Sequence, residues 1–405
     1  MKIKFLLVKF LSKFGVLDSI LRRGYRIVSC NLYRVYSRRL KVQENLIVME
    51  SFSGKNICDS PFALYEELKK DRKLKFIWVV NSTSGSNEIL EDPNTKFVKF
   101  KSREYFSAYA RAKYWISNCR LPYEIHKKKN QIYIQCWHGT PLKKIGCDIN
   151  EGLNKKVSLR ALKASYKNES KRLDYFLSPS KFSSTCFSSS FRLDNQKIVE
   201  VGYPRNDSLV NRADDKYYLK KIRNKLNIPE GKKIVLYAPT WRDNNVSSDT
   251  GKHMLVNLLD HPKFIDGLDD FVFLYRGHYF THLSEKASEF KDVSDYNDVN
   301  DLMLVSDLLI TDYSSLFFDY AILNRPILFF MPDLDEYSKK NRGFYLDVHS
   351  ELPGKICYDM NTLRLNLVES SVQKVSHDEF NLKYNPYEDG SSSNRVIKKI
   401  GICNE

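Results

Sequence analysis

The feature that most constrains the fold is a repeated alternation of short apolar runs and helical segments, which begins near Asn45. Each run is too short for a helix, and turn formers or polar residues follow it. Strands that alternate with helices form parallel, doubly wound sheets. The pattern therefore predicts an α/β fold. The principal runs are LIVME (46–50), FIWVV (76–80), YFLS (175–178), KIVEV (197–201), IVLYA (234–238), FVFLY (271–275), DLLIT (307–311) and PILFF (326–330).

Turn-forming residues near the middle of the chain predict two α/β domains. Turn formers at 202–207 interrupt the alternation, and it restarts after 229–231. A chain of 405 residues is long enough for two domains with substantial cores. The predicted parts are a basic amphipathic segment at 1–41, a first α/β domain at 42–205, a second at 206–390, and a C-terminal helix at 391–405.

The amino-terminal segment combines an apolar stripe with a basic one at roughly helical spacing. Its longest apolar run, Phe5 to Val8, is far shorter than the roughly 20 residues of a spanning helix. No small-residue cleavage site follows it. We expect a helix lying on an anionic membrane surface; the alternative is a helix packed on its own domain. The basic residues are Lys2, Lys4, Lys9, Lys13, Arg22, Arg23, Arg26, Arg34, Arg38, Arg39 and Lys41.

The composition of the chain limits the classes of ligand and cofactor that it is expected to bind. The formal charge of +16 favours an anionic partner, and nucleic acid, a phosphopolymer and acidic lipid are the candidates. The eight cysteines form no CxxC and no zinc-type spacing, so we expect reduced, mostly buried thiols. Neither GxGxxG nor GxxxxGK[ST] occurs, which removes the usual dinucleotide and P-loop signatures.

The stretch QIYIQCWHGTPLKKIG (131–146) places a histidine, His138, after a buried strand. Gly139 lets a ligand or a second backbone come close. Pro141 is expected to open a helix whose free N–H groups, with Lys143 and Lys144, face an anion. This predicts proton transfer beside a phosphate; the alternative is a histidine that is only hydrogen-bonded at a strand end.

Similar polar clusters follow three later strands, and ligands of parallel sheets bind at the carboxyl ends of strands. Arginine neutralises phosphate oxygens, hydroxyls hydrogen-bond to them, and a histidine accepts a proton from an attacking alcohol. Each member alone is a weak signal: Ser314 and Ser315 could cap the following helix, and Arg276 could form a structural ion pair with a carboxylate. Asp319, in the next helix, binds a ribose hydroxyl or faces water. The clustered residues are His138, Thr140, Thr240, Arg242, Arg276, His278, Asp312, Ser314 and Ser315.

With these residues in view, the chain resembles the CDP-glycerol glycerophosphotransferase family of teichoic acid primases and polymerases, which includes CDP-ribitol users and some capsule polymerases. The resemblance covers roughly residues 45–400. Cys136 departs from it, because a larger apolar residue is expected there. The matching strings are ISN (116–118), QCWHGTPLKKIG (135–146), GYPRND (202–207), VLYAPTWRD (235–243), YRGHY (275–279) and the block from Asp298 to Asp347.

The resemblance implies a GT-B fold with two Rossmann-like domains, the acceptor on the first and the cytidine nucleotide on the second. It implies peripheral association with the cytoplasmic side of the cell membrane and a lipid-linked acceptor. By similarity, His138 is the base and His278 a second catalytic residue that stabilises phosphate. The implied substrate-binding residues are Thr140, Lys143, Arg205, Thr240, Arg242, Arg276, Asp312, Ser314, Ser315 and Asp319.

The expected reaction is transfer of glycerol phosphate from CDP-glycerol with release of CMP. CDP-ribitol transfer and a nucleotide-sugar glycosyltransferase of the same fold remain alternatives, and a non-catalytic polyanion-binding protein is a third. No DxD-like cluster stands out, so no cofactor is expected; Mg²⁺ is compatible but not required. No nucleic-acid partner is expected.

Overall fold

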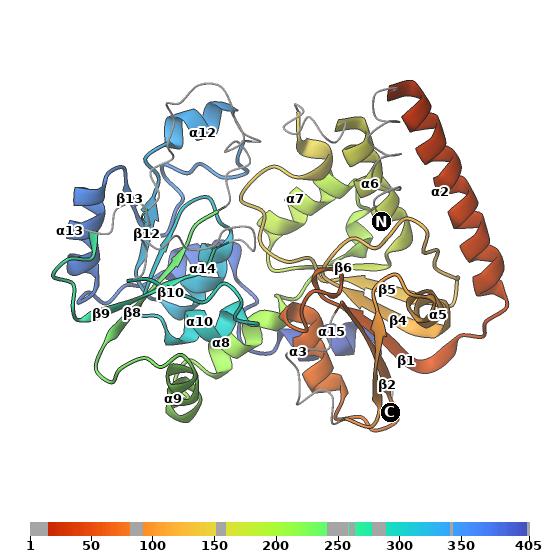
Figure 1. The fold of residues 1–405 in the computed structure, drawn as a ribbon, viewed down its shortest axis with the longest axis horizontal. Helices are drawn as coiled ribbons and strands as arrows, with labels where there is room; N and C mark the ends of the chain where they lie inside the picture. The colour runs from red at the N-terminus through yellow and green to blue at the C-terminus, as the bar shows by residue number, and fades with distance from the viewer. Residues whose placement is uncertain are drawn as a thin grey trace. The chain divides into compact units, whose positions relative to one another are not determined.

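The computed structural model describes residues 15–81, 92–150, 159–240, 258, 264–277, 289–340 and 343–402, with side chains from residue 24 onward except at 338–340. Its packing separates two compact units (Figure 1). Unit 1 comprises Met1–Ile57, Asp71–Gln135 and Asn168–Tyr175. Unit 2 comprises Cys58–Lys70, Cys136–Lys167 and Phe176–Glu405.

Unit 1 is built on five parallel strands in the order β3-β2-β1-β4-β5. In β1, Ile47, Val48 and Met49 are all fully buried, as expected for a strand covered on both faces. Ser102 caps α5, because its side-chain oxygen accepts a hydrogen bond from the Tyr105 N–H. The elements are α2 (Gly15–Arg38), β1 (Gln43–Glu50), η1 (Phe52–Gly54), β2 (Lys75–Val80), β3 (Thr95–Lys99), α5 (Arg103–Arg111), β4 (Ala112–Ser117) and β5 (Ile132–Gln135).

The first sheet has seven strands, and its order ends with β6 (Tyr175–Ser178) and β7 (Ile198–Glu200). These two strands are parallel, with Leu177 opposite Val199. Ser180 caps the serine-rich helix that follows β6. The neighbouring elements are α3 (Asp59–Leu68), η2 (Gly146–Asp148), α6 (Leu159–Arg172), α7 (Lys181–Phe191), η3 (Asn195–Lys197) and α15 (Ser392–Ile400).

The second sheet, in unit 2, has six parallel strands in the order β10-β9-β8-β11-β12-β13. Successive side chains alternate between two cores: Leu236 packs on one face with α10 and α11, and Val235 on the other with α13. The strands are β8 (Lys233–Ala238), β9 (Phe271–Tyr275), β10 (Lys291–Asp292), β11 (Leu308–Thr311), β12 (Ile327–Phe330) and β13 (Lys355–Cys357). The helices are η4 (Pro204–Asn206), α8 (Asp207–Asn211), α9 (Lys216–Lys225), α10 (Val299–Val305), α11 (Leu316–Tyr320), η8 (Ala321–Leu323), α12 (Leu334–Lys340), α13 (Met360–Ser370) and α14 (Asp378–Tyr384).

The predicted α/β class and each strand predicted from an apolar run are confirmed, to within a residue or a few at the ends. Within the C-terminal helix predicted at 391–405, the structure forms α15 over Ser392–Ile400. Three short strands, β3, β10 and β13, were not expected, because none of them is a continuous apolar run. The proposed domain boundaries stay predictions.

Two further expectations concern cysteines and the membrane. Five of the described cysteines are buried and two, Cys30 and Cys119, are half-buried; Cys403 lies outside the described residues. The described helices include none that combines the length and the apolar character needed to cross a bilayer.

Candidate functional site

The His138 side chain is exposed, and its ring stacks on the buried side chain of Trp137. Trp137 has a left-handed backbone (φ 53°), unusual for a bulky residue, and its side chain is buried. The Trp137 ring packs edge-on against Phe191, with centroids 4.9 Å apart, and stacks on the His138 ring at 4.2 Å. The tryptophan therefore anchors an imidazole that remains open to solvent.

Gly139 brings the His138 loop close to Ser315. Its φ of 158° lies in a region that other residues rarely adopt, and a Cβ atom there would lie 3.0 Å from Ser315 Oγ. Ser315 precedes α11, and Ser314 Oγ accepts a hydrogen bond from the Leu316 N–H at 3.3 Å. The structure thus brings the loop that carries His138 close to Ser315, although the sequence placed them in separate strand-end clusters.

Thr140 contributes a buried hydroxyl beside this loop. The residue is 1% exposed, and its Oγ1 has no hydrogen-bond partner among the described residues. Leaving such a group unpaired costs about 1–3 kcal/mol. A hydroxyl in this position is available to bind a ligand.

The helix predicted to open at Pro141 is not formed, so that prediction is wrong. The backbone after Pro141 is extended, and Lys143 forms an antiparallel bridge with Phe344. The Lys144 N–H donates to Gly343 O at 3.0 Å, and the Tyr345 N–H donates to Leu142 O at 2.9 Å. These hydrogen bonds replace the helix N-terminus that was expected to face an anion.

Lys143 keeps a position near the loop. Its ammonium lies 5.2 Å from the centre of the Tyr337 ring, which stacks on Tyr313 at 3.7 Å. The cation is therefore held over an aromatic pair.

Thr240 and Asp312 lie at the ends of the neighbouring strands β8 and β11. Both the N–H and the hydroxyl of Thr240 donate to Asp312 Oδ1, at 2.8 and 2.9 Å. Because a carboxylate repels phosphate, this contact favours a positioning role for Asp312, which orients Thr240.

Arg276, after β9, holds the segment before α10. Its Nη1 donates to Tyr296 O at 2.8 Å and to Val293 O at 3.3 Å. Burial lowers the pKa of Arg276, and the nearby Asp298 opposes that change. Burial also raises the pKa of Asp298, to about 6, with Asp301 adding to the effect.

Arg205 and Asp319 form a buried ion pair. Arg205 Nη2 lies 3.0 Å from Asp319 Oδ2, and Nη1 lies 3.5 Å from Asp59 Oδ2. The Asn206 amide donates to Asp319 Oδ1 at 3.0 Å. These contacts favour a structural role, and substrate binding by Arg205 and Asp319 stays a prediction that the geometry does not support.

Two predicted residues, Arg242 and His278, lie outside the described residues, so a meeting of His138 with His278 stays a prediction. The sequence reasoning missed Trp137; the signal was an aromatic residue next to the strand-end histidine. Among the described residues, no group of three or more His, Cys, Asp and Glu side chains is arranged to hold a metal ion. Metal dependence stays untested.

Residues 32–401 match the model of a family described as CDP-Glycerol:Poly(glycerophosphate) glycerophosphotransferase. The chain is 42% identical to a teichoic acid poly(glycerol phosphate) polymerase of Staphylococcus epidermidis over 84% of this chain and 47% of that protein. It is 38% identical to a teichoic acid glycerol-phosphate transferase of Staphylococcus aureus over 93% of this chain and 98% of that protein. The chain thus spans about half of the first relative and nearly all of the second.

Solved structures of the same family are also similar to this chain. The wall teichoic acid polymerase TagF superposes with a TM-score of 0.80 at 38% identity, over 98% of this chain and 97% of that chain. A TagF variant soaked with CDPG gives 0.82 at 37% identity, with the same coverage. A putative UDP-N-acetylglucosamine 2-epimerase from Listeria monocytogenes superposes with a TM-score of 0.53 at 15% identity, over 88% of this chain and 95% of that chain. It shares the fold alone. These matches confirm the predicted GT-B-like architecture.

Proposed function

Because this chain belongs to the CDP-glycerol:poly(glycerophosphate) glycerophosphotransferase family, we propose that it transfers glycerol phosphate from CDP-glycerol to a hydroxyl of a membrane-linked acceptor and releases CMP. The acceptor is of the teichoic acid or capsule type. The observation that carries the proposal is the exposed His138, whose neighbour Gly139 lies against Ser315, together with the Thr140 hydroxyl, which has no hydrogen-bond partner among the described residues.

In the proposed reaction, the acceptor oxygen attacks the phosphorus atom that bears glycerol. The new O–P bond forms as the bond from that phosphorus to the bridging oxygen of CMP breaks, and His138 accepts the acceptor proton. Trp137 limits the positions of the imidazole, which lowers the entropic cost of reaching the reactive geometry.

Hydroxyls and cations around the loop are suited to the diphosphate. Thr140, Ser314 and Ser315 offer hydroxyl hydrogen-bond donors, and Lys143 offers a positive charge. The two donors of Thr240 are already used by Asp312. The Gly139 backbone leaves the space in which Ser315 approaches the histidine loop. These residues would bind and orient the donor, and His138 would move the proton.

Glycerol is favoured over ribitol as the transferred polyol. The relatives named for glycerol phosphate are 32–42% identical to this chain, whereas those named for ribitol phosphate are 26–29% identical. The test is to incubate the protein with CDP-glycerol, CDP-ribitol or a UDP-sugar, each with a lipid-linked acceptor. Nucleotide release and the mass of the product identify the donor. CMP release from CDP-glycerol with a matching mass increment is expected; acceptor-dependent UDP release instead would contradict the proposal.

We also propose that α2 lies on the anionic surface of the membrane, at its cytoplasmic side. One stripe of α2 is exposed although it is apolar, and Arg34 and Arg38 are also exposed on this helix. A basic cavity of about 460 Å³ at the end of α2 includes Arg38, Lys41 and Lys128 and suits anionic headgroups. The exposed apolar residues are Tyr25, Ile27, Val28, Leu32 and Val35.

Binding to vesicles tests this part separately. Val28→Asp with Leu32→Asp should release the protein from vesicles that contain anionic lipid and should not change donor binding. Tyr217→Asp on α9, where the side chain is 84% exposed, is the matched control. Equal vesicle binding by all three proteins would refute the membrane role of α2.

A further inference from the structure

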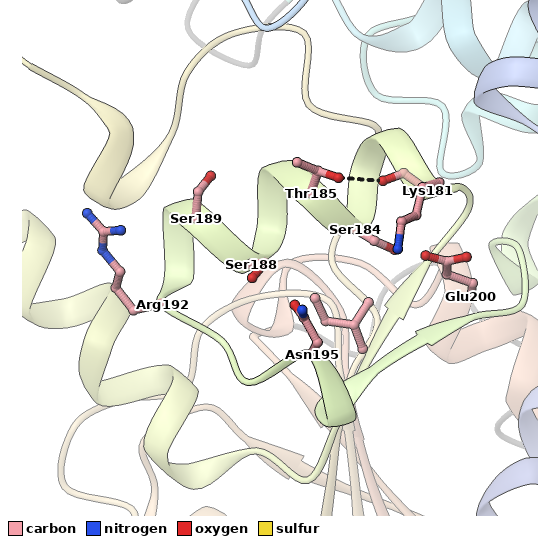
Figure 2. A pocket seen from close by; sticks show the side chains of 9 residues that line it. Lys181, Ser184, Thr185, Ser188, Ser189, Arg192, Asn195 and Glu200 are labelled. Atoms are coloured by element: carbon pink, nitrogen blue, oxygen red, sulfur yellow. Dashed lines mark hydrogen bonds between the residues drawn. The ribbon is translucent and has the colours of Figure 1, made fainter.

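A cavity of about 580 Å³ lies between α7 and β7, and none of its lining residues is assigned to the reaction. Figure 2 shows Lys181 and Glu200 at one end and Arg192 at the other. All of its walls belong to unit 2. The lining residues are Lys181, Ser184, Thr185, Ser188, Ser189, Arg192, Asn195, Ile198 and Glu200.

The two faces of α7 have different tasks. The inner face carries Phe187 and Phe191, which pack on Phe176 with ring centres 4.6 and 5.0 Å apart. The outer face carries polar side chains at helical spacing, among them Thr185 and Ser188, and these line the cavity. Packing on one face therefore fixes the hydroxyls on the other.

The hydroxyls along this face present acceptor oxygens. Thr185 Oγ1 donates to Lys181 O at 3.0 Å, Ser188 Oγ to Leu193 O at 3.3 Å, and Ser189 Oγ to Asp148 Oδ2 at 2.5 Å. Since each hydroxyl proton is used within the protein, the remaining lone pairs can accept hydrogen bonds from a ligand alcohol.

Charge differs between the two ends. Arg192 is exposed and follows the last residue of α7, and none of the described lining residues at this end is acidic, although the Asp148 carboxylate accepts a hydrogen bond from the lining Ser189. At the other end, exposed Lys181 lies near Glu200, whose Oε2 accepts a hydrogen bond from the Tyr387 hydroxyl at 3.5 Å. The Arg192 end thus suits a phosphate, and the mixed end suits alcohol groups, which both donate and accept.

Arg192 also occupies a costly backbone position. Its φ of 55° and ψ of 47° are left-handed, where helices usually place glycine. An arginine there costs roughly 1 kcal/mol relative to glycine. Glycine would therefore fit this backbone position with less strain than arginine does.

We propose that this cavity binds the polyol-phosphate chain of the acceptor, with a phosphate at Arg192 and chain hydroxyls along α7. The inference rests on the proposed function, since it assumes an acceptor that carries such a chain. The inner face of the same helix packs on Trp137, which stacks on His138. One helix thereby connects the chain-binding cavity with the proposed catalytic loop.

The decisive variant is Arg192→Gly, because glycine fits the left-handed position and the protein is expected to fold at least as well. We expect it to weaken binding of a short, soluble glycerol phosphate oligomer about tenfold in a calorimetric titration. Transfer from CDP-glycerol to an acceptor that carries several polyol-phosphate units should show a similar rise in KM, whereas transfer to an acceptor without the chain should not change. Lys220→Ala, an exposed lysine on α9, is the matched loss of one charge.

Glu200→Gln is expected to change the affinity for the oligomer in the opposite direction to Arg192→Gly. It removes a negative charge but keeps the shape and an acceptor for Tyr387, so binding of the anionic oligomer should become about two to five times tighter. A purely structural role for Glu200 predicts no tightening.

The outcomes separate the two proposals. Equal oligomer affinity in the unaltered protein, Arg192→Gly and Lys220→Ala overturns the chain-binding cavity. If inorganic phosphate competes as well as the oligomer, the cavity binds phosphate alone, and the chain assignment is wrong. Absence of transfer to any acceptor overturns the proposed function, and the oligomer titration still reports on the cavity.

Discussion

Two polar clusters in unit 2 include residues that the sequence predicted as substrate ligands, and they differ in whether their charged groups are paired with each other inside the protein. The Arg205 cluster comprises Asp59, Tyr203, Arg205, Asn206, Asp319 and Glu388. Its buried guanidinium is paired with the carboxylates of Asp59 and Asp319, although Arg205 Nη1, the Tyr203 hydroxyl and Asn206 Oδ1 have no hydrogen-bond partner among the described residues. The His138 cluster comprises His138, Gly139, Thr140, Ser314 and Ser315. It contains an exposed imidazole and a buried hydroxyl without a partner among the described residues.

The difference shows that a polar residue near a strand end is not automatically a ligand. Charges that neutralise one another stabilise a junction of loops, because leaving any one unpaired costs several kcal/mol. Groups that remain exposed or unpaired are those that a substrate can complete. Four measurements can break or sharpen this comparison.

The largest effect is expected for Arg205→Ala. It leaves Asp59 and Asp319 buried without their cation, which should cost about 3–5 kcal/mol of unfolding free energy. Denaturant titration measures this. Arg325→Ala, which removes a guanidinium that donates to backbone carbonyls rather than to carboxylates, is the comparison variant and should cost less. A stable Arg205→Ala protein that had lost donor binding would reverse our assignment.

His138→Ala should affect turnover and not stability. The exposed ring contributes little burial, so the unfolding temperature should change little, whereas loss of the base should lower turnover by about a hundredfold or more. CMP release at saturating CDP-glycerol measures the change, with His349→Ala, another exposed histidine, as the control. Donor binding should persist. Undiminished turnover would remove His138 from the mechanism.

The Arg205 cluster should also make stability depend on pH through Glu388. Burial, with a contribution from Asp319, raises the pKa of Glu388 to about 8, well above the 4.5 of an unperturbed glutamate. The folded chain therefore holds a proton that the unfolded chain has lost, and stability falls as pH rises from about 4.5 to about 8. The slope approaches about 1.4 kcal/mol per pH unit.

Glu388→Gln should remove that part of the slope and make the protein more stable than the unaltered chain above pH 8. Thermal unfolding of both proteins across this range provides the measurement. Parallel pH profiles would show that Glu388 ionises normally in the folded protein.

The smallest effect is expected for Thr140→Val. Replacing an unpaired buried hydroxyl by a methyl group should leave stability equal or raise it by about 1 kcal/mol. If the hydroxyl binds the donor, KM for CDP-glycerol should rise several-fold, as a kinetic titration would show. Thr311→Val is the contrast, because Thr311 donates to Ala238 O and should lose stability instead.

Whether an element could be predicted depended on its hydrophobic pattern and on whether a distant part of the chain pairs with it. Strands β8 and β11 were predictable because burial on both faces requires a continuous apolar run. Strand β3 was not, since none of its residues is buried and TKFVK is not a continuous apolar run. The segment after Pro141 was predicted as a helix because proline suits a first turn, but the chain near Phe344 offered it a partner that local sequence does not reveal.

The sequence by itself determined the α/β class, the strand positions and the order of the polar clusters, because hydrophobic period and turn residues act over a few neighbouring positions. Only the tertiary structure decided which polar groups pair with each other inside the protein and which remain accessible to a ligand. Arg205 and Ser315 look equally suited to phosphate in the sequence. One is neutralised by carboxylates far away along the chain, and the other lies against the glycine next to an exposed histidine. Long-range packing makes that choice, and local pattern does not encode it.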